Sequence, residues 1–143
     1  MFKEPEVARW WGHWDVARVR TELLEDPQIE VLAIERDGEV IGVVQIVEET
    51  EPDYHHAALD ISLATEHHGQ GLGREALRLL IDHLAADRDH HRFTIDPAAE
   101  NERAIRSYTA VGFEPVGVMH MYERAPDGTW RDGLFMELIV RPS

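Results

Sequence analysis

The chain has 143 residues, and its 28 Asp and Glu against 14 Lys and Arg give a formal net charge of −14. Hydrophobic residues make up 43% of it, which suffices for the core of one domain over residues 1–143 and not for two. The absence of cysteine excludes disulfides, thiolate zinc sites and cysteine nucleophiles. The charge argues against nucleic acid and favours a cationic partner, although it would serve solubility equally well.

The N-terminal residues turn acidic at once, and no stretch reaches the ~20 apolar residues of a membrane span. We therefore expect a cytoplasmic protein with no membrane partner. Several of the nine histidines form adjacent pairs, a spacing that does not present two ligands on one helical face. No metal site is predicted.

The first half of the chain predicts helices followed by three strands. Apolar residues at helical spacing indicate one or two short helices over residues 5–24. Two β-rich runs, 31–36 and 39–47, flank an Asp-Gly pair that is typical of a tight hairpin. An exposed acidic loop is expected over 48–54, and alternation predicts a strand over 57–64.

The second half predicts two helices and three strands. A glycine-rich turn at 67–73 opens an amphipathic helix over 74–84, and Gly112 ends a second helix over 101–110. The predicted strands cover residues 92–95, 113–122 and 133–140. This order of elements predicts an α/β (α+β) domain with a mixed, mostly antiparallel sheet.

Gly69, Gly71 and Gly73 lie between a predicted strand and a predicted helix. Backbone N–H groups at a helix start can bind an anion, and glycine lets a phosphate approach them closely. The Lys-Ser/Thr ending of a P-loop and the Rossmann spacing are both absent, which disfavours nucleotide triphosphatases and dehydrogenases. A glycine turn without a ligand is the alternative.

Two segments resemble a known family. His68-Gly-Gln-Gly71-Leu-Gly73 meets the pattern Arg/Gln-x-x-Gly-x-Gly/Ala, with His in the first place. The second segment supplies, in the family's order, Asn101, Ala104, Ile105, Tyr108, Gly112 and Phe113. Over about residues 7–140 the chain thus resembles the GCN5-related N-acetyltransferase superfamily. Its aminoglycoside 6'-N-acetyltransferases are the most similar, through Trp10-Trp11-Gly12, Asp96-Pro97 and residues 103–108.

The resemblance implies helices around a sheet whose central parallel strands, 57–64 and 92–95, splay apart to take acetyl-CoA as co-substrate. Backbone N–H near Leu63 would polarise the thioester carbonyl, and Asn101 would bond the pantetheine arm. The implied coenzyme-binding residues are Leu63, His68, Gly69, Gln70, Gly71, Leu72, Gly73, Arg74 and Asn101. Family members begin with a strand ahead of the first helix, and here we expect that strand to be trimmed or missing.

The implied chemistry is direct attack of a primary amine on the thioester. Tyr108 would be the general acid that returns a proton to the thiolate, with a core aromatic as the alternative. Asp60 would be either the base or a carboxylate that only binds the amine. Asp96 would face the acceptor, or else cap the following helix. The acidic loop would lie over the acceptor, with Asp53 and Tyr54 nearest to it.

The resulting expectation is an aminoglycoside 6'-N-acetyltransferase that confers antibiotic resistance, acting as a monomer or homodimer. One alternative is a lysine/siderophore-type or other small-amine N-acyltransferase. Another, from a different class, is a non-catalytic acyl-CoA-binding module, against which intact Asp60 and Tyr108 argue.

Overall fold

The computed structural model describes residues 2–3, 29–64, 69 and 71–141. The strands form one seven-stranded sheet in the order β1-β2-β3-β4-β5-β7-β6, and among them the β4–β5 pair is parallel while the others are antiparallel. The predicted mixed sheet is thereby confirmed. The elements are β1 (Phe2–Lys3), β2 (Ile29–Arg36), β3 (Glu39–Glu49), β4 (His56–Leu63), α3 (Leu72–Arg88), β5 (Arg92–Ile95), α4 (Glu102–Val111), β6 (Glu114–Arg124) and β7 (Trp130–Ile139).

The edge beside β2 differs from the expectation. β1 pairs antiparallel with β2, with Phe2 opposite Ile34. A short strand of two residues therefore precedes residues 5–24, over which the first helix is expected. Two residues carry no readable alternation, which is why the sequence pattern does not reveal this strand. The helices expected over residues 5–24 lie outside the described residues.

The hairpin between β2 and β3 follows its local sequence. Asp37 and Gly38 both have positive φ, 53° and 81°. Those values are typical of the type I′ turn, whose twist matches that of the two strands it joins. The turn sets the register that brings β3 alongside β4.

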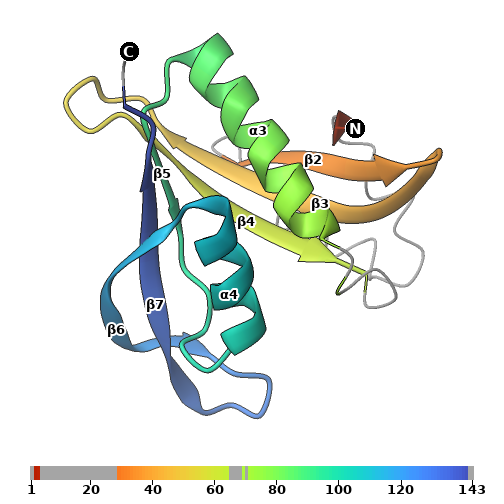
Figure 1. The fold of residues 1–143 in the computed structure, drawn as a ribbon. Coiled ribbons are helices and arrows are strands. Elements are labelled where there is room, and N and C mark those ends of the chain that lie inside the picture. Colours follow the sequence, from red (N-terminus) through yellow and green to blue (C-terminus); the bar gives the residue numbers. More distant parts are fainter. Residues whose placement is uncertain (1, 4–28, 65–68, 70, 142–143) are drawn as a thin grey trace.

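Both described helices cover the same face of the sheet (Figure 1), α3 across β2 to β4 and α4 beside β5 and β7. On α3 the buried side chains are Ala76, Leu77, Leu80, Ile81 and Leu84. They share one hydrophobic core with Phe93 of β5 and Phe113. Within the described residues, neither helix is long and apolar enough to cross a membrane.

The central parallel strands diverge, as the resemblance implies. β4 pairs with β5 at Ala57–Phe93 and Ala58–Thr94. Beyond these pairs β4 continues along β3 as far as Leu63, opposite Gly42, whereas β5 pairs with β7. The carboxyl half of β4 is therefore free of β5.

Candidate active site

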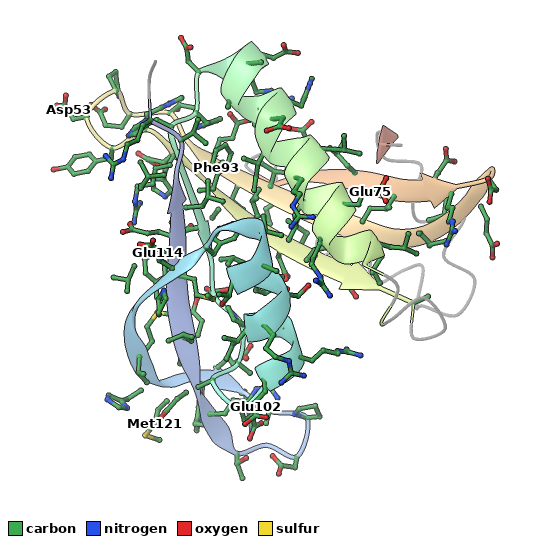
Figure 2. All side chains as sticks on the ribbon, in the orientation of Figure 1. Asp53, Glu75, Phe93, Glu102, Glu114 and Met121 are labelled. Carbon is green, nitrogen blue, oxygen red and sulfur yellow. The ribbon has the colours of Figure 1, made fainter. Side chains whose placement is uncertain are left out.

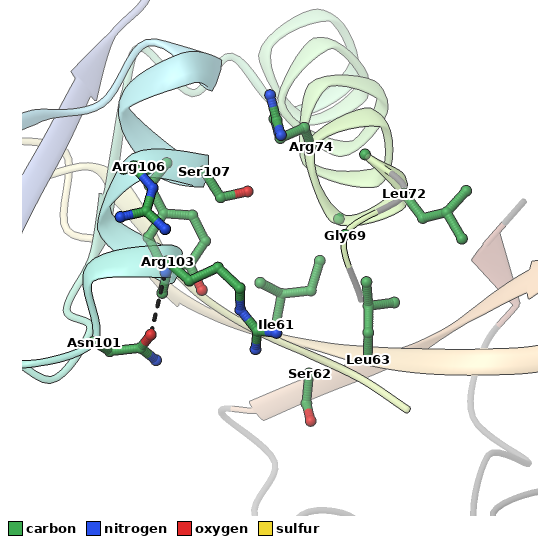
Figure 3. Close-up of a pocket in the computed structure, with 14 residues that line it drawn as sticks. Ile61, Ser62, Leu63, Gly69, Leu72, Arg74, Asn101, Arg103, Arg106 and Ser107 are labelled. Atoms are coloured by element: carbon green, nitrogen blue, oxygen red, sulfur yellow. Dashed lines mark hydrogen bonds between the residues drawn. The ribbon is translucent and has the colours of Figure 1, made fainter. Parts of the chain in front are cut away.

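A pocket of about 560 Å³ lies beside the carboxyl end of β4, between the first turns of α3 and α4 (Figure 3). This volume suits a small-molecule ligand. The described residues that line it are Ile61, Ser62, Leu63, Gly69, Gly71, Leu72, Gly73, Arg74, Asn101, Arg103, Ala104, Arg106, Ser107 and Tyr108.

The pocket is positively charged. Arg74 of α3 and Arg103 and Arg106 of α4 are among its lining residues (Figure 3), while none of the described lining residues is acidic. In a chain of net charge −14 this is a local reversal of sign, and guanidinium groups suit phosphate oxygens. Arg74 is among the coenzyme-binding residues expected from the sequence, whereas Arg103 and Arg106 are not. Their i, i+3 spacing in the predicted helix was the available signal.

The glycine-rich turn leaves room for a ligand. Gly69 and Gly71 have φ of 79° and 75°, and a Cβ at either would meet no atom of the described residues within 4 Å. A side chain there would occupy open space beside the pocket rather than the core. Gly71 is the N-cap of α3, and no side chain among the described residues caps the helix. The N–H groups of its first turn therefore suit an anion.

Asn101 begins α4 at the opposite wall. Its Oδ1 accepts a hydrogen bond from the N–H of Ala104 at 3.2 Å. The N-cap of α4 is therefore Asn101, and the alternative that Asp96 caps this helix is excluded. With Oδ1 so engaged, the amide NH₂ is the part of this side chain that is suited to donate to a ligand.

The N–H groups of β4 alternate between its two edges. Ala64 N–H donates to the carbonyl of Ile41 on β3 at 2.9 Å. The alternation of an antiparallel ladder therefore turns the N–H of Leu63 toward the other edge, where β5 has diverged. Leu63 also lines the pocket, so the edge of β4 from which β5 has diverged borders the pocket.

Tyr108 lies where the pocket meets two carboxylates. Its ring packs edge-on against buried Phe113, at 6.3 Å between centroids. Burial, and then the negative charges of Asp60 and Asp96, raise the pKa of Tyr108 to about 12. The phenol is therefore protonated at neutral pH and able to donate a proton. The structure thus brings together three residues that the sequence placed in the site.

Asp60, on β4, is crowded by like charge. Loss of hydration and repulsion from Asp96 raise the pKa of its carboxyl above the ordinary value, while a hydrogen bond from the N–H of Ile61 opposes the shift. Glu123 adds a smaller repulsion. A cation placed among these groups would relieve the repulsion, so the arrangement suits an ammonium group.

Asp96 stands directly after β5 and has a partner that the sequence analysis missed. The hydroxyl of Tyr122 donates to its Oδ2 at 2.5 Å. This hydrogen bond raises the pKa of Tyr122 to about 12, with burial as the next cause. The pair depends on an irregularity in β6, between Met119 and Glu123. Strand periodicity in the sequence gives no sign of it.

None of the described residues of the acidic loop lines this pocket, and the expectation that Asp53 and Tyr54 lie at the acceptor stays a prediction. Figure 2 shows Asp53 at one end of the sheet and Glu102, the first residue of α4, at the other. Both loop residues precede β4, whereas the pocket adjoins its carboxyl end. The eight residues from Asp53 to Ile61 would span about 26 Å if fully extended.

Glu48 is likewise engaged elsewhere. It belongs to β3 and accepts hydrogen bonds from Arg88 at 2.5 Å and from buried His90 at 2.6 Å. Glu30 of β2 also pairs with Arg88, at 2.7 Å. This network joins the end of α3 to the sheet. The contacts of Glu48 are therefore structural.

Two of the expected coenzyme-binding residues, His68 and Gln70, lie outside the described ranges. Among the described residues, no three His, Asp or Glu side chains come together in a way that could hold a metal ion.

Comparison with known proteins adds to this geometry. A model described as "Acetyltransferase (GNAT) family" matches residues 3–113. The chain belongs to the GNAT acetyltransferase family. It is therefore an acetyl-CoA-dependent N-acetyltransferase, and the enzyme class expected from the sequence is confirmed.

Curated relatives of this GNAT protein have different acceptors in their names. An aminoglycoside N(6')-acetyltransferase type 1 of Klebsiella pneumoniae is 30% identical over 142 residues, covering 85% of this chain and 68% of the relative. A spermidine N(1)-acetyltransferase of Escherichia coli (strain K12) is 28% identical over 113 residues, covering 79% of this chain and 60% of the relative.

Solved structures share the GNAT fold. The spermidine/spermine N-acetyltransferase of Vibrio cholerae superposes with a TM-score of 0.78 at 18% identity, covering 97% of this chain and 91% of that one. A ribosomal-protein-alanine N-acetyltransferase of Brucella melitensis gives a TM-score of 0.76 at 23% identity, with 97% and 99% covered. At these identities the likeness concerns the fold alone.

Proposed function

We propose that the protein transfers the acetyl group of acetyl-CoA to a primary amine, the 6'-amine of a cationic aminoglycoside, and so protects a cell from the antibiotic. One observation carries the proposal: charges of both signs are divided into two groups around Tyr108. Tyr108 lines the pocket that contains the arginines, and the negative charges of Asp60 and Asp96, which are not among the lining residues, also act on it. A polyanionic coenzyme and a polycationic acceptor need this division.

The coenzyme side has a set of donors that suits acetyl-CoA. Arg74, Arg103 and Arg106 would pair with its phosphates, together with the N–H groups of the turn at Gly69 and Gly71. Asn101 would donate its amide to the pantetheine arm. The N–H of Leu63 would polarise the thioester carbonyl, because it lies on the β4 edge that β5 leaves.

The acceptor side would then complete the reaction. Asp60 and Asp96 attract the ammonium, and Asp60, with its raised pKa, is suited to take up the proton that the amine must lose. The neutral amine nitrogen forms a bond to the thioester carbon, the carbon–sulfur bond breaks, and Tyr108 protonates the leaving thiolate. The surplus proton that the nitrogen carries after the attack then passes to the phenolate of Tyr108 and restores it. Because positioning alone can supply roughly 7–11 kcal/mol, no covalent acetyl-enzyme is needed.

A second candidate is a linear polyamine. It is favoured by the spermidine N(1)-acetyltransferase among the relatives and by the same pair of carboxylates. The aminoglycoside remains the leading proposal because that relative is 30% identical over a larger share of both chains.

The test is a thiol-release assay with acetyl-CoA against aminoglycosides, spermidine, lysine and a peptide with an N-terminal alanine. We expect turnover with aminoglycosides to exceed that with the other amines. Turnover with spermidine alone would replace the aminoglycoside by the polyamine. Turnover with lysine or the peptide alone would contradict both candidates.

A further inference from the structure

The Tyr122–Asp96 contact crosses a strand. β7 lies between β5, which Asp96 follows, and β6, which carries Tyr122. The phenol ring passes over β7 at Gly133, where a Cβ would come within 2.8 Å of Cδ2 of the ring. Gly133 is not among the glycines with positive φ. The contact therefore requires glycine at this position because it lacks a side chain, and not because of its backbone conformation.

A bulge in β6 points the tyrosine at this gap. Met119 pairs with Gly133 and Glu123 pairs with Arg131, so three residues of β6 face Asp132 alone. Asp132 Oδ1 accepts the N–H of Met121 at 2.9 Å. Met121 has a φ of 49°, a left-handed conformation that non-glycine residues adopt at a cost. The strained bulge of β6 and the absence of a side chain at Gly133 thus both allow the hydrogen bond between Tyr122 and Asp96.

We infer that Tyr122 is a positioning residue of the acceptor site, whose hydroxyl holds Oδ2 of Asp96 so that Oδ1 is presented to an ammonium group of the acceptor. This inference rests on the proposed function. An unrestrained carboxylate must lose side-chain freedom when it binds a cation, whereas a hydrogen-bonded one has already lost it. The effect therefore concerns acceptor binding, and Tyr122 takes no part in the acetyl transfer itself.

Two variants remove the restraint by different routes. Tyr122→Phe deletes only the hydroxyl and keeps the ring over Gly133. Gly133→Ala keeps the hydroxyl and displaces the ring. For both we expect the KM of the acceptor to rise about three- to tenfold, the loss expected for one hydrogen bond to a charged group at a partly exposed site. The kcat and the KM of acetyl-CoA should change less than twofold.

Two comparisons separate positioning from a structural role. Gly117→Ala is the matched control. Gly117 lies on β6, the strand of Tyr122, and a Cβ there meets no atom of the described residues within 4 Å, so the kinetics of this variant should equal those of the wild type. In an Asp96→Asn background, Tyr122→Phe should add no further rise in acceptor KM, because the group that it orients has lost its charge.

Failure of this inference and failure of the proposed function give different results. An active enzyme whose acceptor KM is unchanged in Tyr122→Phe would overturn the positioning role alone. A rise in acceptor KM that is equally large in the Asp96→Asn background would overturn it too. A protein that acetylates none of the amines in the panel would overturn the proposed function and the positioning role together.

Discussion

At the scale of single residues, Tyr108 is the side chain on which the chemistry depends. Burial and the nearby carboxylates raise its pKa to about 12, so the phenol carries its proton throughout the neutral range. We predict that Tyr108→Phe lowers kcat by roughly 10²-fold or more and leaves the KM of acetyl-CoA within about twofold. The edge-on packing of the ring against Phe113 would persist. Steady-state kinetics check this, and an unchanged kcat would remove Tyr108 as the acid.

Asp60 should show a conflict between stability and activity. Folding raises the pKa of this carboxyl, so the folded protein binds a proton there more readily than the unfolded chain does. At a pH above the folded-state pKa the carboxyl is charged, and this charge destabilises the folded protein. Asp60→Asn should therefore raise Tm at pH 7 and lower kcat/KM about tenfold or more.

The pH dependence of this effect follows from its sign. As the pH falls through the raised pKa toward 3.8, the penalty disappears and the difference in Tm should vanish. Thermal unfolding at pH 7 and at acidic pH measures it. A Tm gain that is the same at both pH values would refute the account of Asp60.

At the scale of elements, Asn101 combines a helix cap and a proposed ligand to the coenzyme. Serine also caps helices but has no amide to donate. We predict that Asn101→Ser retains stability within about 0.5 kcal/mol and raises the KM of acetyl-CoA about five- to tenfold. Asn101→Ala should lose the cap as well, at about 1 kcal/mol. Urea unfolding and kinetics on both variants separate the two roles; equal KM values for Ser and wild type would leave the cap alone.

Glu48 ties three elements together, through Arg88 of α3 and His90 beside β5. Burial alone would raise its pKa, yet the hydrogen bonds from His90 and Arg88 lower it. Glu48→Gln should therefore cost about 1–3 kcal/mol of unfolding free energy at neutral pH. Glu49→Gln, at the exposed neighbour, is the control and should cost almost nothing.

The sign again sets the pH window. A lowered folded pKa means that the stabilisation by Glu48 is present above the ordinary value of 4.5 and is lost as the pH falls through the folded pKa. Urea unfolding of wild type and Glu48→Gln over this range should show the two curves converging at acidic pH. Curves that stay parallel would contradict the network.

The elements that local sequence specifies were predicted correctly. The Asp37-Gly38 turn, the glycine opening of α3 and the Asn101 start of α4 each depend on a few adjacent residues. The composition of the acidic loop does not say which end of β4 adjoins the pocket, because that depends on where β5 diverges. Tyr122 was missed because a bulge, which breaks strand periodicity, directs it to Asp96.

At the scale of the whole molecule, the net charge of −14 attracts a polycationic acceptor. The same net charge repels the anionic coenzyme, whereas the arginines that line the pocket attract it. Salt screens the attraction of the acceptor and both effects on the coenzyme. We predict that raising ionic strength from about 50 to 300 mM increases the acceptor KM several-fold and changes the KM of acetyl-CoA less, because two opposing effects are screened there. An acceptor KM that is independent of salt would mean that the charge has no part in binding.

The most direct test of the central claim uses two aminoglycosides that differ only at the 6' position, one with an amine and one with a hydroxyl. The measurement is the rate of thiol release from acetyl-CoA with each, together with the mass of the product. We predict catalytic turnover and a single added acetyl group with the amine, and release no faster than without acceptor for the hydroxyl. Equal turnover with both compounds, or none with either, would contradict it.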